Sequence, residues 1–182
     1  NGFNHIRIDE IARNNDNMNH FSKDSKIKIL CVGALNDTKN QMTLLQILQN
    51  MRIEAEFIFL GDGINKKRLS NYAKNFISHN KISFKGRVSR NIAIEHMLEA
   101  DVSISLSKGE GLPIAVLETM YAGCFQILSN ITPHKEISPP IERCIFVDVK
   151  NKLEIINSLS FIRDNISSIK SKRLISKEYS IN

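Results

Sequence analysis

The chain has 182 residues, of which 42% are hydrophobic, and its 25 Lys and Arg against 19 Asp and Glu give a net charge of +6. This length and apolar content suit one domain with a core of its own rather than two. The basic residues are scattered and carry no motif interleaved with aromatics, so we expect no nucleic-acid partner.

The positive charge leaves several explanations open. A mild basic face could attract phosphorylated substrates or make peripheral contact with an anionic membrane. An ordinary solvated surface explains the charge equally simply, and we favour it. No apolar run of about 18 residues exists, and the first residues do not have the pattern of a signal peptide.

Three cysteines indicate the compartment. Cys31 and Cys144 fall inside predicted strands and Cys124 at a helix-to-strand junction, with no C-x-x-C spacing. This pattern favours buried, reduced thiols. Because reduced thiols are typical of the cytosol, we expect a cytoplasmic location, with peripheral contact at the inner face of the cytoplasmic membrane as an open alternative.

Apolar runs and amphipathic stretches alternate along most of the chain. Residues 1–25 are rich in Asn and Asp and predict an interdomain linker or irregular lead-in. Strands are then predicted at 27–32, 55–60, 82–85, 102–106, 126–129 and 145–148. Helices are predicted at 41–51, 66–78, 91–99, 113–122 and 152–163.

The strands show little alternation of apolar and polar residues, which indicates burial on both faces and hence a parallel sheet. Strands alternating with helices predict an α/β fold, a doubly wound parallel six-stranded sheet of Rossmann-like type, over residues 26–163. A polar helix or tail is predicted at 164–182.

Glycines follow the first two predicted strands. Gly33 opens a loop that ends at Lys39, directly before a predicted helix, where the Lys charge and the free N–H groups of the helix could hold a phosphate. Taken alone, an exposed loop lysine is the simpler interpretation. Gly61 and Gly63 resemble a dinucleotide fingerprint, but Lys66 stands at the third glycine position and the strand is the wrong one. We therefore reject a nicotinamide or flavin site and expect a tight turn that allows close approach to a ligand.

Two carboxylates, Glu110 and Glu118, give a sharper signal. They follow a predicted strand, at the edge where open α/β sheets bind ligands. Pro113 suits the first helical position, so Glu118 would lie roughly 7.5 Å further along the helix. The pair could hold hydroxyls at opposite ends of a sugar nucleotide, with its phosphates at the helix N-terminus. The alternative is a surface Glu and a first-turn Glu favoured by the helix dipole.

Other catalytic patterns are absent from the sequence. The five His fall in different predicted elements, with no H-E-x-x-H, D-x-D, G-x-S-x-G or Walker A pattern, so we expect no metal site and no cofactor. His134 and Glu136 would lie on the same rim as the two carboxylates, or be surface residues.

Together these motifs resemble the carboxyl-terminal, donor-binding domain of the GT-B glycosyltransferases of family four, the glycosyl transferases group 1. The matching residues are Gly33, Lys39, Gly61, Gly63, Gly86-Arg87-Val88, Ala100-Asp101-Val102, Ser107, Glu110-Gly111-Leu112-Pro113, Leu117-Glu118, Gly123 and Ser129 to Glu136. The first residues, Asn1-Gly2-Phe3-Asn4, resemble the segment with which the family leaves its amino-terminal domain.

The resemblance implies two catalytic residues, Lys39 on the donor diphosphate and Glu110 on the sugar hydroxyls. It implies a donor-binding set in which Glu118 holds the ribose, while the backbone meets the base, sugar and phosphates: Gly33, Gly61, Gly63, Arg87, Val88, Gly111, Leu112, Pro113 and Glu118. Enzymes of this family are retaining and metal-independent, and the departing diphosphate helps to deprotonate the acceptor on the same face.

Two departures from the family pattern matter. Members usually carry Arg directly after the first glycine, where this chain has Ala34, and the loss could weaken donor binding by roughly 1.5–3 kcal/mol. The acceptor site and part of the catalytic apparatus come from an amino-terminal half. The resemblance therefore implies a nucleotide-sugar domain that transfers a sugar to a glycan or lipid-linked acceptor only together with that half, and is inactive alone.

Two further functions stay open. Ala34 slightly favours a non-catalytic sugar-nucleotide-binding module, either a degenerate transferase or one half of a two-protein enzyme. A sugar-nucleotide epimerase on the same fold would need acid and base residues from the other half.

Overall fold

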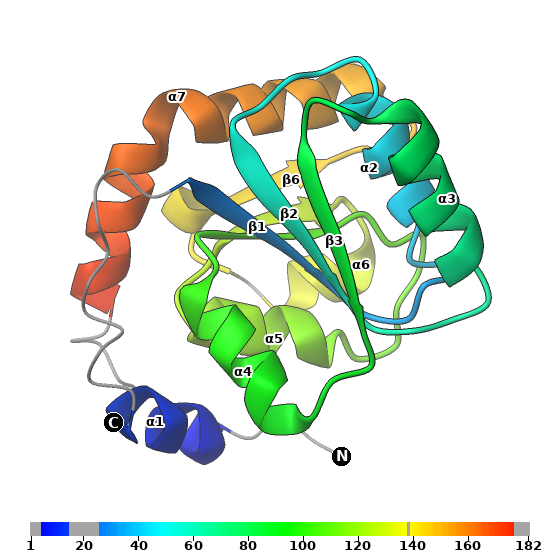
Figure 1. The fold of residues 1–182 in the computed structure, drawn as a ribbon. Coiled ribbons are helices and arrows are strands. Elements are labelled where there is room, and N and C mark those ends of the chain that lie inside the picture. The colour runs from blue at the N-terminus through cyan, green and yellow to red at the C-terminus, as the bar shows by residue number, and fades with distance from the viewer. Residues whose placement is uncertain (1–4, 15–25, 138, 177–182) are drawn as a thin grey trace.

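The structure of the protein is a computed structural model that describes residues 5–14, 26–137 and 139–176. Six parallel strands form a sheet in the order β3-β2-β1-β4-β5-β6 (Figure 1). The strands are β1 (Ile27–Val32), β2 (Ala55–Leu60), β3 (Lys81–Gly86), β4 (Val102–Ser105), β5 (Phe125–Ser129) and β6 (Cys144–Val147). The helices are α1 (His5–Asn14), α2 (Gln41–Leu48), α3 (Lys66–Phe76), α4 (Arg90–Glu99), α5 (Ile114–Tyr121), α6 (Thr132–Glu136) and α7 (Lys152–Ser176), with a 3₁₀ turn, η2 (Ile141–Arg143).

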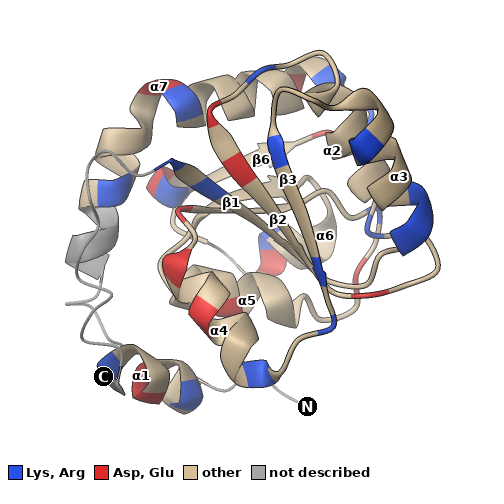
Figure 2. Cartoon of the chain, in the orientation of Figure 1, with Lys and Arg blue, Asp and Glu red and all other residues tan. Residues whose placement is uncertain are grey.

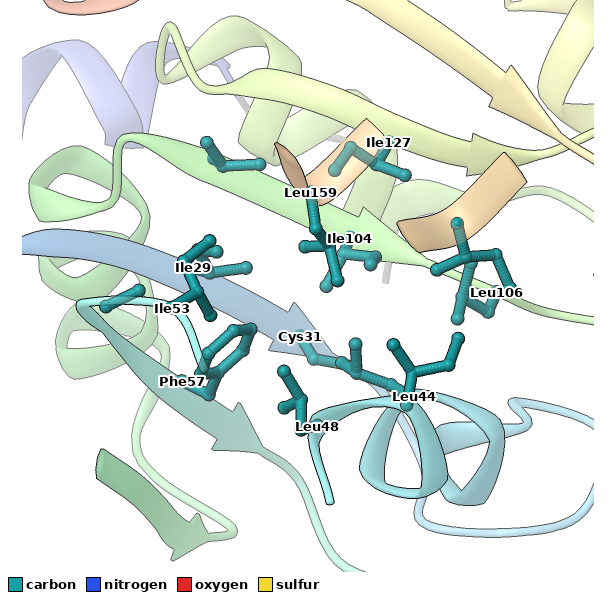
Figure 3. Close-up of a cluster of buried hydrophobic side chains, with 14 of the residues drawn as sticks. Ile29, Cys31, Leu44, Leu48, Ile53, Phe57, Ile104, Leu106, Ile127 and Leu159 are labelled. Atoms are coloured by element: carbon teal, nitrogen blue, oxygen red, sulfur yellow. The ribbon is translucent and has the colours of Figure 1, made fainter. Parts of the chain in front are cut away.

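Helices cover both faces of the sheet, because successive side chains of a strand point to opposite faces and both sets are apolar here. Ile29 and Cys31 of β1 belong to a core shared with α2, α3 and α7 (Figure 3). Leu30, between them, belongs to a second core shared with α1, α4 and α5. The doubly wound α/β fold class is confirmed, and the strand order reverses between β1 and its neighbour β4.

The elements lie close to their predicted positions. β1 and β2 have the predicted ends, β4 and β5 differ by one residue at one end, and β3 and β6 differ by one residue at each end. Helix α2 stops three residues earlier than predicted, and α6 is not predicted at all because five residues are too few to show a helical period.

The first described segment is a helix, whereas residues 1–25 predict a linker or irregular lead-in. Helix α1 buries Ile8 and Ile11 in the second core. The Tyr121 hydroxyl donates to the Asp9 carboxylate, with its oxygen 3.1 Å from Oδ1 and 2.9 Å from Oδ2. The expectation of an irregular segment is therefore wrong for 5–14. The predicted resemblance at Asn1 to Asn4 lies outside the described residues.

Helix α7 runs past residue 163, where the predicted domain ends and the predicted tail begins. Its backbone departs from helical geometry at Asn165 (φ −119°, ψ 15°), and Ile162 and Ile169, on either side of this kink, are both buried in the first core. The core therefore continues into the predicted tail. No helix in the described part of the chain has the length and apolar content needed to cross a membrane.

The cysteines and the charges match their predicted distribution. Cys31, Cys124 and Cys144 are buried, and burial raises the pKa of Cys31 and of Cys144 to about 12. Lys and Arg occur together with Asp and Glu on α1, α4 and α7, whereas α3 carries Lys and Arg alone (Figure 2).

Candidate functional site

The candidate site lies at the carboxyl ends of β1 and β4, the two adjacent strands at which the strand order reverses. Two hydrogen bonds tie the loops that follow them. The Lys108 N–H donates to the Thr38 carbonyl at 2.8 Å, and the Asn40 side-chain amide donates to the Leu106 carbonyl at 3.2 Å. Asn40 adopts the left-handed conformation (φ 57°, ψ 32°), so the chain turns sharply into α2. The turn places Lys39 beside the loop after β4.

Lys39 and Glu110 form a bidentate ion pair. Lys39 Nζ lies 2.5 Å from Oε1 and 2.6 Å from Oε2 of Glu110, and the Ser107 hydroxyl donates to Oε1 at 2.6 Å. The Glu110 side chain is 7% exposed and that of Lys39 is 25% exposed. Because an ammonium has three N–H donors, Lys39 can remain on Glu110 and still bind an anionic group from the solvent side.

The glycines after β1 and β2 allow two backbones to touch. A Cβ at Gly61 would lie 2.0 Å from the Gly33 carbonyl oxygen, and a Cβ at Gly63 would lie 2.5 Å from the Leu35 carbonyl oxygen. The glycines form tight turns, as predicted. The predicted close approach is to a ligand, whereas in the structure the backbone of the loop after β2 closely approaches the backbone of the loop after β1. At Gly111, by contrast, a Cβ would meet no atom within 4 Å.

Glu118 lies on α5, with its side chain 4% exposed, and forms an ion pair with Arg90. Arg90 is the first residue of α4, directly after Ser89, whose hydroxyl accepts a hydrogen bond from the Ile92 N–H at 3.4 Å. The guanidinium Nη2 contacts Glu118 Oε1 directly, and apart from this ion pair the oxygen has no hydrogen-bond donor among the described residues. No sequence motif identifies Arg90 as a residue of the site. The one feature of the sequence that could have drawn attention to Arg90 is its position: it is a basic residue at the start of a helix, where the helix dipole disfavours positive charge.

His134 is fully buried behind the Lys39–Glu110 pair, so its interpretation as a surface residue is wrong. Its Nδ1 lies 3.0 Å from the Ser129 carbonyl, and since a carbonyl only accepts, Nδ1 carries the proton. The Ser129 hydroxyl donates at 2.6 Å to the carbonyl of Ser107, the serine whose hydroxyl binds Glu110. Burial lowers the pKa of His134, and the nearby charge of Lys39 lowers it further. The hydrogen bond to the Ser129 carbonyl and the charge of Glu110 act in the opposite direction but do not outweigh burial. The imidazole is therefore held neutral.

The remaining predicted residues lie around these groups. Helix α5 begins at Ile114, so Pro113 is the residue before the helix rather than its first residue, and it is buried. Arg87, Gly111, Leu112 and Glu136 are exposed, and Val88 packs partly against the second core. Among the described residues, no group of three or more His, Cys, Asp or Glu could hold a metal ion.

Comparison with known proteins gives one family. The family described as Glycosyl transferases group 1 matches residues 12–179. The O-antigen biosynthesis glycosyltransferase WclY of Escherichia coli is 29% identical over 109 residues, which are 60% of this chain and 30% of that protein. The capsular polysaccharide biosynthesis glycosyltransferase CapH of Staphylococcus aureus is 27% identical over 151 residues, which are 77% of this chain and 39% of that protein. The chain thus spans well under half the length of either relative.

A solved structure supports the fold. Anabaena Alr3699/HepE, in complex with UDP-glucose, matches 92% of this chain and 47% of its own with a TM-score of 0.72 at 15% identity. At this identity the likeness shows the fold, a Rossmann-like domain of the GT-B type.

Proposed function

The chain belongs to the group 1 glycosyltransferases, and from this premise we propose that it is the nucleotide-sugar-binding domain of a retaining transferase. The acceptor is a glycan or a lipid-linked glycan, bound through an amino-terminal half. The observation that carries the proposal is the Lys39–Glu110 pair, held by Ser107 at the point where the strand order reverses. Open α/β sheets bind their ligands at this point.

In the proposed reaction the domain stabilises the leaving group. The bond between the sugar C1 and the diphosphate oxygen breaks with its electron pair on that oxygen, where negative charge develops. Lys39, a quarter exposed beside this position, meets the charge together with the backbone N–H groups before α5. The acceptor hydroxyl forms the new bond to C1 on the same face and passes its proton to the departing diphosphate. No metal ion or cofactor takes part in this scheme.

The two acidic residues position the donor. Glu110 is fixed by Lys39 and Ser107, so it can accept hydrogen bonds from sugar hydroxyls without rearranging. Glu118 would hold the ribose, and the backbone at Arg87 and Val88 would meet the base. The name of the HepE complex, which contains UDP-glucose, is in keeping with a donor of this chemical class.

Ligand-observed NMR with UDP, GDP and ADP tests the proposal. We expect one nucleotide class to bind, and Lys39→Ala to weaken it by roughly tenfold or more, because one charge-assisted contact is lost. Lys74→Ala, which removes an exposed Lys from α3, is the matched control for charge and should change little. Equal effects of the two substitutions, or no nucleotide binding at millimolar concentration, would contradict the proposal.

Ala34 favours a second candidate, a non-catalytic sugar-nucleotide-binding module, because the first loop lacks one cation for the diphosphate. A transfer assay separates the two candidates. The transferase in its natural full length should turn over donor with acceptor, and residues 1–182 alone should bind donor without transferring sugar. Binding without turnover by the full-length protein would favour the module.

We also propose a cytoplasmic location, which the burial of all three cysteines supports. Contact with the inner face of the membrane would be peripheral.

A further inference from the structure

We propose that Arg90 is a positioning residue for Glu118, and that their ion pair holds the buried carboxylate ready to accept hydrogen bonds from the ribose of the nucleotide. This inference rests on the proposed function of the same site. It adds a residue for which the sequence motifs give no role.

Arg90 is poorly explained by the helix on which it lies. It is the first residue of α4, where the aligned peptide dipoles place partial positive charge and a cation is disfavoured. Ser89 already caps this helix end with its hydroxyl. The Arg90 side chain, 45% exposed, instead reaches across to α5, where it contacts Glu118 Oε1. Its position is therefore explained by Glu118.

Glu118 needs a counter-charge because its side chain is 4% exposed. Removing a carboxylate from water is strongly unfavourable unless a cation compensates for it, and Arg90 is that cation. The contact leaves a hydrogen-bonding vacancy: Glu118 Oε1 is buried and accepts no hydrogen bond from the described residues. Buried acceptors are normally satisfied, so this oxygen is suited to a donor that arrives with a ligand.

A ribose matches that vacancy, since its 2′ and 3′ hydroxyls are adjacent O–H donors. Arg90 Nη2 contacts one side of Oε1, and because a carboxylate offers about four lone-pair sites, others stay available to a ligand. Arg90 thus supplies charge and orientation, and leaves the lone pairs to the ligand. An ion pair that only fastened α4 to α5 would change stability without changing recognition of the ribose.

Ribose selectivity is the measurement that separates these roles. It is the ratio of the Kd of the 2′,3′-dideoxynucleoside diphosphate to that of the matching nucleoside diphosphate, determined by calorimetry on the full-length protein. In the wild type we expect a ratio of roughly ten or more, as for hydrogen bonds to a charged group. Arg90→Gln should bring the ratio close to one, Arg90→Lys should restore part of it, and Arg90→Gln should add nothing in a Glu118→Gln background.

Arg163→Gln is the matched control, because Arg163 is a half-exposed arginine paired with an acid, Asp164, on α7. It should keep the wild-type ratio. If Arg90→Gln weakens both nucleotides equally, so that the ratio is unchanged, the inference is overturned while the proposed function stands. Absence of nucleotide binding by the wild type would overturn both. Thermal unfolding of each variant shows which are folded, and Arg90→Lys carries the test if Arg90→Gln does not fold.

Discussion

Replacing Lys39 should destabilise the fold more than neutralising its partner Glu110. In Lys39→Met the stem that packs over Gly33, with Cε 3.5 Å from a Cβ position there, is retained and the charge is lost. The Glu110 carboxylate, 7% exposed, is then left with the Ser107 hydroxyl as its donor. In Glu110→Gln the amide oxygen still accepts from Ser107, and the Lys39 ammonium, 25% exposed, can turn to water.

The expected magnitudes follow from these exposures. Breaking a fully buried pair costs about 3–5 kcal/mol and breaking an exposed pair at most about 1 kcal/mol. Since Glu110 is buried and Lys39 only partly so, we expect about 2–3 kcal/mol for Lys39→Met and about 1 kcal/mol for Glu110→Gln. The double variant should lose about 1.5 kcal/mol, because no unpaired charge remains, which corresponds to a coupling energy of about 2 kcal/mol.

Urea unfolding followed by circular dichroism measures all four proteins. Lys66→Met is the control, because Lys66 and Asp62 form an exposed pair at 2.7 Å and its loss should leave the midpoint almost unchanged. The reasoning is refuted if the two single variants lose equal stability, or if the coupling energy is below about 0.5 kcal/mol.

Two other predictions concern the framework of the site. Gly61→Ala should cost more than about 3 kcal/mol in urea unfolding, because its Cβ would lie 2.0 Å from the Gly33 carbonyl oxygen at a φ of +134°. Gly109→Ala, with no atom within 4 Å, should be nearly neutral, and similar losses would contradict the account. Because burial lowers the pKa of His134, the unfolded chain binds the proton first, so stability should fall as pH drops below about 6.5. His134→Gln should remove this part of the pH dependence between pH 8 and 5, and an unchanged slope would show that His134 does not cause it.

The sequence predicts the sheet well because its central strands are apolar on both faces. The apolar runs that form β1 and β2 contain few polar residues. The point where each run gives way to polar residues or glycine therefore marks the end of the strand. Helix α1 shows why other segments are harder to predict. Its sequence mixes apolar and charged residues, and the buried Ile8 and Ile11 pack against partners from distant parts of the sequence, the α4 and α5 regions.

The site could be predicted residue by residue but not as a set of contacts. The sequence identifies Lys39, Glu110 and Glu118 from their places after strands. It does not reveal that Lys39 binds Glu110, 71 residues away, or that Glu118 is buried against Arg90. Such contacts depend on how the loops cross at the strand ends, which no local pattern encodes.

The ion pairs also bear on what the domain can do alone. Each acidic residue proposed to hold the donor is paired with a cation, Glu110 with Lys39 and Glu118 with Arg90, so the two pairs together carry no net charge. The pairing makes burial of the carboxylates tolerable and preorganises them, but it also offsets the charges of Lys39 and Arg90. Ala34 removes the further cation that the family usually has in the first loop. If the proposed amino-terminal half completes the donor site, we expect the full-length protein to bind donor more tightly than residues 1–182.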